Sequence, residues 1–128
     1  MATGEKILIV EDEKSLLQIY TTYLTSKGLQ IVSANDGEEA LKAVNEPGLQ
    51  LVLLDIRIPK IDGLTVLKEI RKNKNFDKLP IYMMSVLGSS EVSEQATKAG
   101  ADGYLVKDAL NPEELRQEIL KAIEKGRG

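Results

Sequence analysis

Four charged residues each come directly after a short apolar run of the sequence. Glu11 and Asp12 follow residues 7–10, Asp55 follows residues 51–54, and Lys107 follows residues 104–106. Short apolar runs bounded by turn signals are typical of buried strands in a parallel sheet. Because open α/β sheets bind ligands at the carboxyl ends of their strands, the sequence predicts that three acids and one lysine gather at that edge.

Gathered in this way, these residues predict a site for a divalent cation and a phosphoryl group. Mg²⁺ prefers oxygen ligands, which Glu11, Asp12 and Asp55 supply, and clustered carboxylates repel one another unless a cation lies between them. Lys107 can neutralise one phosphoryl oxygen, and Ser85, at the end of another apolar run, can donate a hydrogen bond to a second. Asp55 would then be the nucleophile that forms an aspartyl phosphate.

Taken singly, each of these residues has an ordinary structural explanation. An acid after a strand is most often a helix cap or a solvated loop residue, and a lone lysine is most often a surface residue. The required residue types nevertheless coincide at four different strand ends. That coincidence favours the joint chemical interpretation.

The rest of the chain predicts the elements that place these residues on one edge. Strand and helix patterns alternate five times. Expected strands cover 6–10, 30–34, 50–55, 80–85 and 103–107, and expected helices cover 13–27, 38–45, 63–73, the segment between Ser90 and Gly100, and a last helix that begins at Asn111-Pro112. The first helix carries apolar side chains at helical spacing, namely Leu16, Leu17, Ile19, Tyr20, Tyr23 and Leu24. Five alternating units predict an α/β fold with a parallel sheet and helices on both faces.

The composition is that of one globular domain without thiol or imidazole chemistry. The chain has 128 residues, 42% of them apolar and 29% charged, with a net charge of −3, which suits a single core and gives no general attraction to nucleic acid or membrane. It contains no cysteine and no histidine, which excludes disulfides, thiolate or histidine metal sites and a phosphohistidine on this chain. A signal peptide and a run of about 18 apolar residues are both missing, so a cytoplasmic protein is expected.

Four segments, in their order and spacing, make the chain similar to the receiver domains of two-component response regulators. The segments are Ile7-Leu8-Ile9-Val10-Glu11-Asp12-Glu13, Asp55-Ile56-Arg57-Ile58-Pro59-Lys60-Ile61-Asp62-Gly63, Met84-Ser85 and Gly100-Ala101-Asp102-Gly103-Tyr104-Leu105-Val106-Lys107. The resemblance implies one receiver domain at 5–125, with flexible ends at 1–4 and 126–128. It also implies a chemotaxis-regulator-like, flavodoxin-like (βα)5 fold, in which a three-layer sandwich surrounds a five-stranded parallel sheet of order 2-1-3-4-5.

The resemblance assigns the acidic residues to phosphoryl acceptance and metal binding. It implies that Asp55 accepts phosphate from a sensor histidine kinase or a histidine phosphotransfer protein. It further implies that Mg²⁺ is bound by Glu11, Asp12, Asp55 and the backbone carbonyl of Arg57. The chain would catalyse its own phosphorylation and a slow self-dephosphorylation without being a turnover enzyme.

The resemblance also implies a switch. Ser85 and Lys107 would contact the phosphoryl oxygens, and Tyr104 matches an aromatic position that turns inward when Ser85 is drawn to the phosphate. A downstream partner or output domain would read this two-state change on the fourth helix, fifth strand and fifth helix. The same face is the candidate surface for a phosphorylation-driven homodimer. No direct nucleic-acid or membrane binding is implied.

Three positions depart from the family pattern. Asp108 stands where a proline joined by a cis peptide is usual, and because a cis non-proline bond costs roughly 2.5–4 kcal/mol, a trans bond or a shifted loop is expected. Val86 replaces a smaller residue and would narrow access to the phosphoryl group. Leu87 cannot orient an attacking water by a hydrogen bond, and Arg57 can cover the water's path, which leads to the hypothesis of slow self-dephosphorylation.

Three other functions fit the sequence less well. A haloacid-dehalogenase-like phosphatase carries a second acid two residues after its nucleophile, where this chain has Arg57. A flavodoxin-like cofactor binder needs a small, polar phosphate loop after the first strand, where this chain has Glu11-Asp12-Glu13. The alternative kept here is a receiver-like interaction module that acts without phosphorylation.

Overall fold

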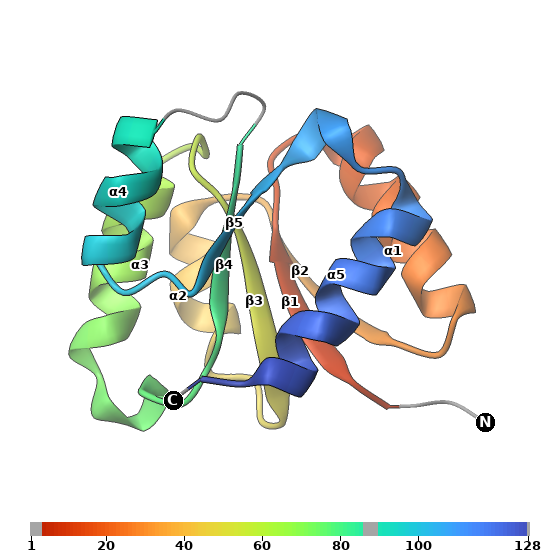
Figure 1. The fold of residues 1–128 in the computed structure, drawn as a ribbon, viewed down its shortest axis with the longest axis horizontal. Coiled ribbons are helices and arrows are strands. Elements are labelled where there is room, and N and C mark those ends of the chain that lie inside the picture. The colour runs from red at the N-terminus through yellow and green to blue at the C-terminus, as the bar shows by residue number, and fades with distance from the viewer. Residues whose placement is uncertain (1–3, 86–89, 128) are drawn as a thin grey trace.

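Five parallel strands form the centre of the molecule (Figure 1). The computed structural model describes residues 4–85 and 90–127, although not the side chains of residues 90, 91 and 108. The strands are β1 (Lys6–Val10), β2 (Gln30–Ala34), β3 (Leu49–Asp55), β4 (Ile81–Ser85) and β5 (Gly103–Val106). They lie in the order β2-β1-β3-β4-β5. The predicted parallel sheet and its strand order are therefore confirmed.

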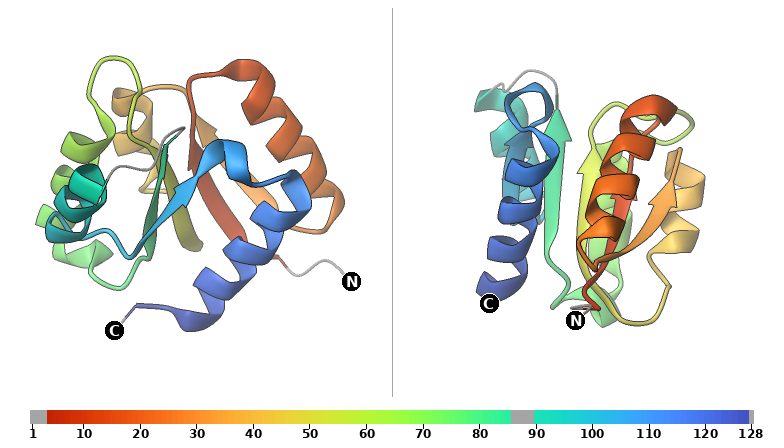
Figure 2. Two further views of the ribbon diagram at one scale, coloured as in Figure 1. Left: turned by 45° about the horizontal axis from the view of Figure 1, so that its top comes forward. Right: turned by 90° about the vertical axis from the view of Figure 1, so that its right-hand side faces the viewer.

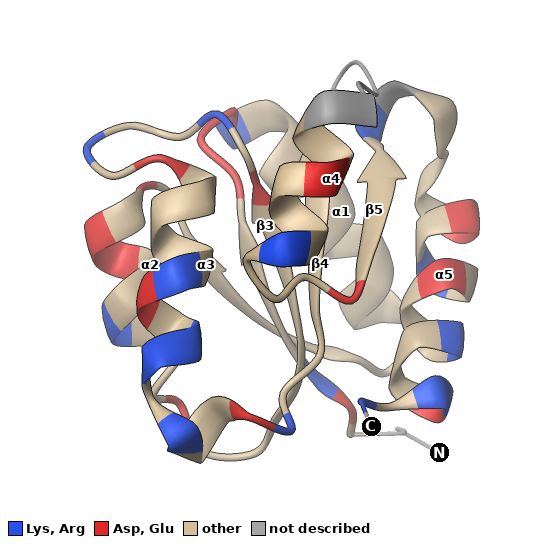
Figure 3. Cartoon of the chain, turned by 60° about the vertical axis from the view of Figure 1, so that its left-hand side comes forward, with Lys and Arg blue, Asp and Glu red and all other residues tan. Residues whose placement is uncertain are grey.

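Helices cover both faces of the sheet, so that the molecule has three layers (Figure 2). The helices are α1 (Lys14–Ser26), α2 (Gly37–Ala43), α3 (Gly63–Lys72), α4 (Ser90–Lys98) and α5 (Pro112–Lys125), with short 3-10 turns η1 (Lys74–Phe76) and η2 (Lys107–Ala109). One face of the sheet packs against α1 and α5, and the other packs against α2, α3 and α4. Charged residues occur mainly in the helices and loops around the sheet, and few lie in the strands (Figure 3).

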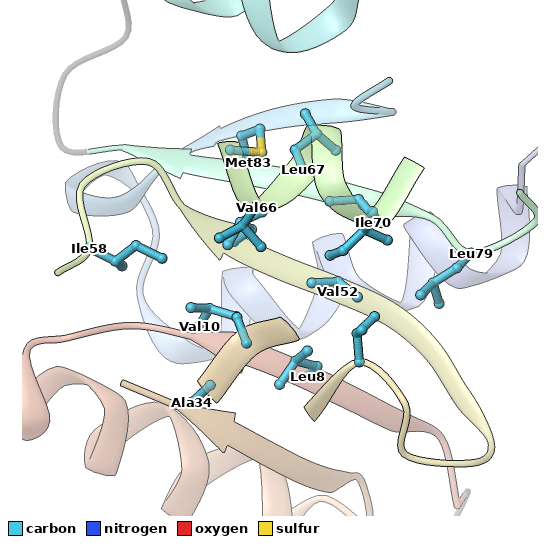
Figure 4. Packing of buried hydrophobic residues seen from close by; sticks show 14 of the residues in the cluster. Leu8, Val10, Ala34, Val52, Ile58, Val66, Leu67, Ile70, Leu79 and Met83 are labelled. Carbon is cyan, nitrogen blue, oxygen red and sulfur yellow. The ribbon is translucent and has the colours of Figure 1, made fainter. Parts of the chain in front are cut away.

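The strands β1 and β3 are buried on both faces, which explains their continuous apolar sequences. Successive side chains of a strand point to opposite faces, so Ile7 and Leu53 pack on the α1 and α5 side, whereas Leu8 and Val52 pack on the α2, α3 and α4 side. The apolar residues form one cluster on each face of the sheet, and Figure 4 shows the cluster on the α2, α3 and α4 side, around Val10, Val52 and Met83. Both clusters pack against β1 and β3, the strands whose carboxyl ends carry the acids.

Helix starts follow the capping residues of the sequence. The side chain of Asn111 accepts a hydrogen bond from the Glu114 amide, and the Glu114 side chain accepts one from the Asn111 amide, with Pro112 in the first turn. This confirms the predicted start of the last helix. Asp36 and Asp62 cap α2 and α3 in a similar way, by accepting hydrogen bonds from backbone amides three residues later.

The end of the fifth strand and the outer face of α1 differ from the sequence expectation, whereas the bond after Lys107 is trans, as expected. The fifth strand ends at Val106, one residue earlier than expected, because Lys107 opens the 3-10 turn η2. The described residues contain no cis peptide bond, so the Lys107–Asp108 bond is trans.

On α1, Ile19 lies at helical spacing with the core residues but is 53% exposed, because the apolar stripe of α1 is wider than the face it buries.

Charged side chains also tie together the amino-terminal edge of the sheet. Asp102, just before β5, accepts hydrogen bonds from the Arg71 guanidinium at 3.0 Å, the Arg127 guanidinium at 2.8 Å and the Ile81 amide at 2.9 Å. Arg71 also donates to the carbonyls of Phe76 and Gly100. These contacts join α3, β4, β5 and the segment after α5, including Arg127, which the sequence places in a flexible end.

We expect Asp102→Ala to lower the free energy of unfolding by about 3 kcal/mol, because it leaves the largely buried Arg71 guanidinium without its carboxylate. Urea unfolding at neutral pH measures this change. Lys72→Ala is the matched control: it breaks the exposed pair between Lys72 and Glu69 and should cost less than about 0.5 kcal/mol. Equal losses in the two variants would contradict a structural role for the buried ion pair.

Candidate functional site

Three carboxylates meet at the carboxyl edge of the sheet, as the sequence predicts. Glu11 follows β1 and is 0% exposed, Asp55 ends β3 and is 4% exposed, and Asp12 is exposed to solvent. Each offers a carboxylate oxygen within 4.8 Å of the others. The parallel strands β1 and β3 pair with Val10 opposite Leu54. The next residue of each strand path, Glu11 and Asp55, therefore lies beside the other.

Lys107 lies between the two buried carboxylates. Its Nζ is 2.6 Å from Glu11 Oε1 and 2.9 Å from Asp55 Oδ2, and the second contact is also a hydrogen bond. Since β4 lies between β3 and β5, the lysine side chain reaches across the end of β4 to make these contacts. The Lys107 ammonium group thus joins the ends of three strands.

Burial and neighbouring charges shift the pKa values of Glu11 and Lys107. Burial raises the pKa of Glu11 above its usual value, and the nearby charge of Asp55 adds to the increase, while Lys107 opposes it. Burial by itself lowers the pKa of Lys107, but hydrogen bonds and charge interactions with Glu11 and Asp55 outweigh burial, so that this pKa is raised. Lys107 therefore remains a cation throughout the neutral range.

Each buried carboxylate contacts Lys107 through one oxygen and a backbone amide through the other. The second oxygen of Asp55, Oδ1, accepts a hydrogen bond from the Arg57 amide at 3.1 Å. The second oxygen of Glu11, Oε2, accepts one from the Glu13 amide, also at 3.1 Å. Each acid therefore has one oxygen on Lys107 and one on the backbone two residues later, which fixes the direction in which the carboxylate points.

The oxygen donors suit a hard divalent cation. The three carboxylates carry a formal charge of −3 and the Lys107 ammonium carries +1, which leaves −2 among these four side chains. A divalent cation would neutralise that remainder, and Mg²⁺ binds carboxylate and carbonyl oxygens while it retains several waters. The residues present therefore fit Mg²⁺, and the exposed Asp12 leaves the site open to solvent on one side.

The other predicted site residues that the structure describes lie on β4, on β5 and just after β3. Ser85 ends β4, beside the end of β3, and is half-buried. Tyr104 lies on β5, pairs in register with Met83 and packs, half-buried, against the core on the α2, α3 and α4 side. The Arg57 side chain is exposed. Val86, Leu87 and the following Gly88-Ser89 lie outside the described residues.

A cavity of about 570 Å³ lies at the opposite edge of the sheet. Its lining includes Val44, Leu49, Asn73, Leu79 and Ile123. Leu49 begins β3, whereas Asp55 ends it, so the length of the strand separates this cavity from the carboxylates. The cavity takes no part in their chemistry.

Comparison with known proteins decides the family of this fold and site. Residues 7–120 match the family described as the response regulator receiver domain. The chain belongs to this family. Its relatives include a probable transcriptional regulator, ycf27, of Guillardia theta, which is 41% identical over 125 residues. That match covers 96% of this chain and 47% of the relative, so the receiver spans about half the length of such a regulator.

Solved structures agree with this assignment. The chemotaxis protein CheY4 of Vibrio cholerae superposes with a TM-score of 0.86 at 28% identity, covering 93% of this chain and 98% of that chain. The receiver domain of the sensor histidine kinase PA1611 of Pseudomonas aeruginosa, whose structure has a magnesium ion in the active-site cleft, superposes with a TM-score of 0.84 at 27% identity. It covers 95% of this receiver and 99% of its own chain. No described helix of this receiver is long and apolar enough to cross a membrane.

Gly63 is a site residue of this receiver that the sequence analysis did not single out. A Cβ atom there would lie 2.2 Å from the Asp55 carbonyl oxygen and 2.7 Å from Ile56 Cα. The Gly63 amide also donates to the Ile56 carbonyl at 2.8 Å. Glycine is therefore needed where α3 begins directly behind Asp55, and the Asp62-Gly63 pair resembles an ordinary turn signal until that approach is seen.

We expect Lys107→Met to lower the free energy of unfolding by about 3 kcal/mol, because two buried carboxylates then lack their shared cation. Adding Asp55→Asn to Lys107→Met should recover part of the loss, since it removes one of the two repelling charges. Urea unfolding of the two single variants and the double variant measures the coupling, expected at about 1–2 kcal/mol.

Lys121→Met is the control for the loss of a lysine charge. Its ammonium is exposed and lies 3.5 Å from Glu118, so the substitution should change stability by less than about 0.5 kcal/mol. Strictly additive effects of Lys107→Met and Asp55→Asn would show that Lys107 and Asp55 are not energetically linked.

Proposed function

We propose that this receiver accepts a phosphoryl group on Asp55 in a Mg²⁺-dependent reaction. The donor is the phosphohistidine of a sensor histidine kinase or of a histidine phosphotransfer protein. The observation that carries the proposal is the pairing of Asp55 Oδ2 with Lys107 beside two further carboxylates. This arrangement supports the proposed roles of Asp55 as the nucleophile, Lys107 as the cation for the phosphoryl oxygens and the carboxylates as metal ligands.

The chemistry is mostly positioning and charge compensation. Glu11, Asp12, Asp55 and the backbone carbonyl of Arg57 would hold Mg²⁺, which when bound neutralises charge on the phosphoryl oxygens. An Asp55 oxygen forms the bond to phosphorus while the bond from phosphorus to the donor's histidine nitrogen breaks, and the electron pair of that bond stays on the nitrogen. The Arg57 amide, which donates to Oδ1, orients the attacking carboxylate.

Two further residues complete the proposed phosphoryl site. When the aspartyl phosphate forms, the Lys107 ammonium shifts from the Asp55 carboxylate to a phosphoryl oxygen. This shift needs only the movement of one flexible side chain. The hydroxyl of Ser85, at the end of β4, donates a hydrogen bond to another oxygen. Both residues are already at the edge where the phosphoryl group arrives.

The proposed readout is a shift between two conformations of the α4, β5 and α5 face. Ser85 moves toward the phosphoryl group, and Tyr104 on β5 turns further into the core. A downstream partner or an attached output domain reads this face, and a homodimer through it is part of the proposal. The relatives named transcriptional regulators are about twice as long as this chain, which supports an output domain in proteins of that kind.

The proposed receiver domain covers residues 5–125, and the expected cytoplasmic location stays a prediction. The alternative is a receiver-like interaction module that acts without phosphorylation. The receiver contains Glu11, Asp12, Asp55 and Lys107, the residues that a phosphoacceptor needs, which favours phosphorylation. The experiment below separates the two functions.

We expect the intact mass of the protein to rise by one phosphoryl group after incubation with acetyl phosphate and Mg²⁺. The gain should vanish in Asp55→Asn, because an amide is not a nucleophile for this transfer, and it should vanish when EDTA removes the metal. Mass spectrometry of the native chain and the variant measures both effects. A native chain that gains no mass would favour the interaction module.

We expect the phosphorylated form to persist for minutes or longer. The exposed Arg57 side chain lies two residues after the acceptor, where it can shield the phosphoryl group from attacking water. Following the decay of the phosphorylated mass after removal of acetyl phosphate measures the lifetime. Arg57→Ala should shorten it and Lys72→Ala, on the distant part of α3, should not; a native lifetime of seconds would refute slow self-dephosphorylation.

A further inference from the structure

The loop between β3 and α3, residues 56–62, carries the Arg57 carbonyl assigned above to the metal. Its two ends are fixed close to the acceptor, because the Arg57 amide donates to Asp55 and the Gly63 amide donates to the Ile56 carbonyl. The tip of the loop lies against a different element, the first turn of α2. There the Gly37 amide donates to the Pro59 carbonyl at 3.2 Å.

The contact between Gly37 and the loop leaves no space for a side chain. A Cβ atom at Gly37 would lie 2.3 Å from the Ile61 carbonyl oxygen and 2.6 Å from Ile61 Cβ. Gly37 does not have a positive φ, so an alanine there would meet no backbone strain. Glycine is therefore required at this position because the loop approaches so closely, and not because of the backbone conformation. A larger residue would have to push the loop away from α2.

Lys60, on the loop, adds ion pairs to the contact between the loop tip and the start of α2. Its φ of 71° is in the left-handed region, and the Ile61 amide donates to the Pro59 carbonyl at 2.9 Å, which makes a tight turn around Lys60. The Lys60 ammonium lies 3.6 Å from Asp36 and 3.4 Å from Glu38, both at the start of α2. A strained residue with a long side chain thus spans the space between loop and helix.

We propose that this contact of the loop tip with α2, made by Gly37 and closed by Lys60, positions the Arg57 carbonyl for the cation. Arg57 lies between the fixed base of the loop and the Pro59 carbonyl that Gly37 holds. Because Mg²⁺ demands near-ideal octahedral geometry, displacement of the tip changes the metal affinity even though neither Gly37 nor Lys60 touches the metal. The inference rests on the metal site of the proposed function.

Gly37→Ala tests the steric part of the proposal. The new Cβ displaces the loop at Ile61, and the affinity for Mg²⁺, measured by isothermal titration calorimetry without any phosphoryl donor, should fall roughly ten-fold. Ile119→Val is the control, because it removes a methyl group from a fully buried residue of α5 that is far from the loop in the fold. It lowers the urea midpoint and should leave the Mg²⁺ affinity unchanged.

A charge exchange tests the contact by a second route and does not depend on the folding of Gly37→Ala. Lys60→Glu places a third acid beside Asp36 and Glu38, and should weaken Mg²⁺ binding by roughly two- to five-fold. Adding Glu38→Lys to Lys60→Glu restores an opposite-charge pair and should recover the affinity. Recovery in the double variant is a result that simple destabilisation of the loop does not produce.

The outcomes separate this inference from the proposed function. A native chain that binds no Mg²⁺ overturns the metal site and with it the proposed function. A native chain that binds Mg²⁺, with Gly37→Ala and Lys60→Glu binding equally well, overturns the positioning contact and leaves the proposed function in place. Weaker binding in both variants, with recovery in the charge exchange and no change in Ile119→Val, is the expected result.

Discussion

The ion pairs of Lys107 with Glu11 and Asp55 are the interaction on which the rest of the site depends. Two carboxylates at the end of a fully buried pair of strands repel each other, and a buried charge without a partner is strongly destabilising. Lys107 supplies that partner from the turn directly after β5, a strand that makes no backbone pairing with either β1 or β3. A phosphoryl group on Asp55 would compete for the same ammonium, so the proposed phosphorylation would act directly on the end of β5.

The position of β5 depends on charged contacts at both of its ends. As an edge strand it pairs with β4 alone, and its residues are only half-buried. Lys107 ties its carboxyl end to the acids, and Asp102 ties its amino end to Arg71 and Arg127. The central strands, held by two apolar clusters, have no such dependence. If Asp55 is phosphorylated as proposed, this contrast would direct the effect of the new charge to the face around β5 and not to the core.

Sequence patterns identified the elements wherever the cause was local. Apolar runs predicted the strands, and the Asn111-Pro112 signal predicted the start of α5, because burial and capping leave their mark within a few residues. The end of β5 was predicted one residue too late, since Lys107 directly follows the apolar run in sequence but opens the turn η2. The need for glycine at positions 37 and 63 was not predicted, because the backbone of Ile61 and of Asp55 approaches these positions only in the folded chain.

The sequence by itself determined which residue types stand at the strand ends, and hence the chemistry that the edge can support. Only the tertiary structure decided how these residues share their contacts: one oxygen of each buried acid on Lys107 and the other on a backbone amide. Lys107 and Asp55 are 52 residues apart, and their distance follows from strand order, register and the turn after β5. Those are set by the packing of the whole core, which no short segment of the sequence contains.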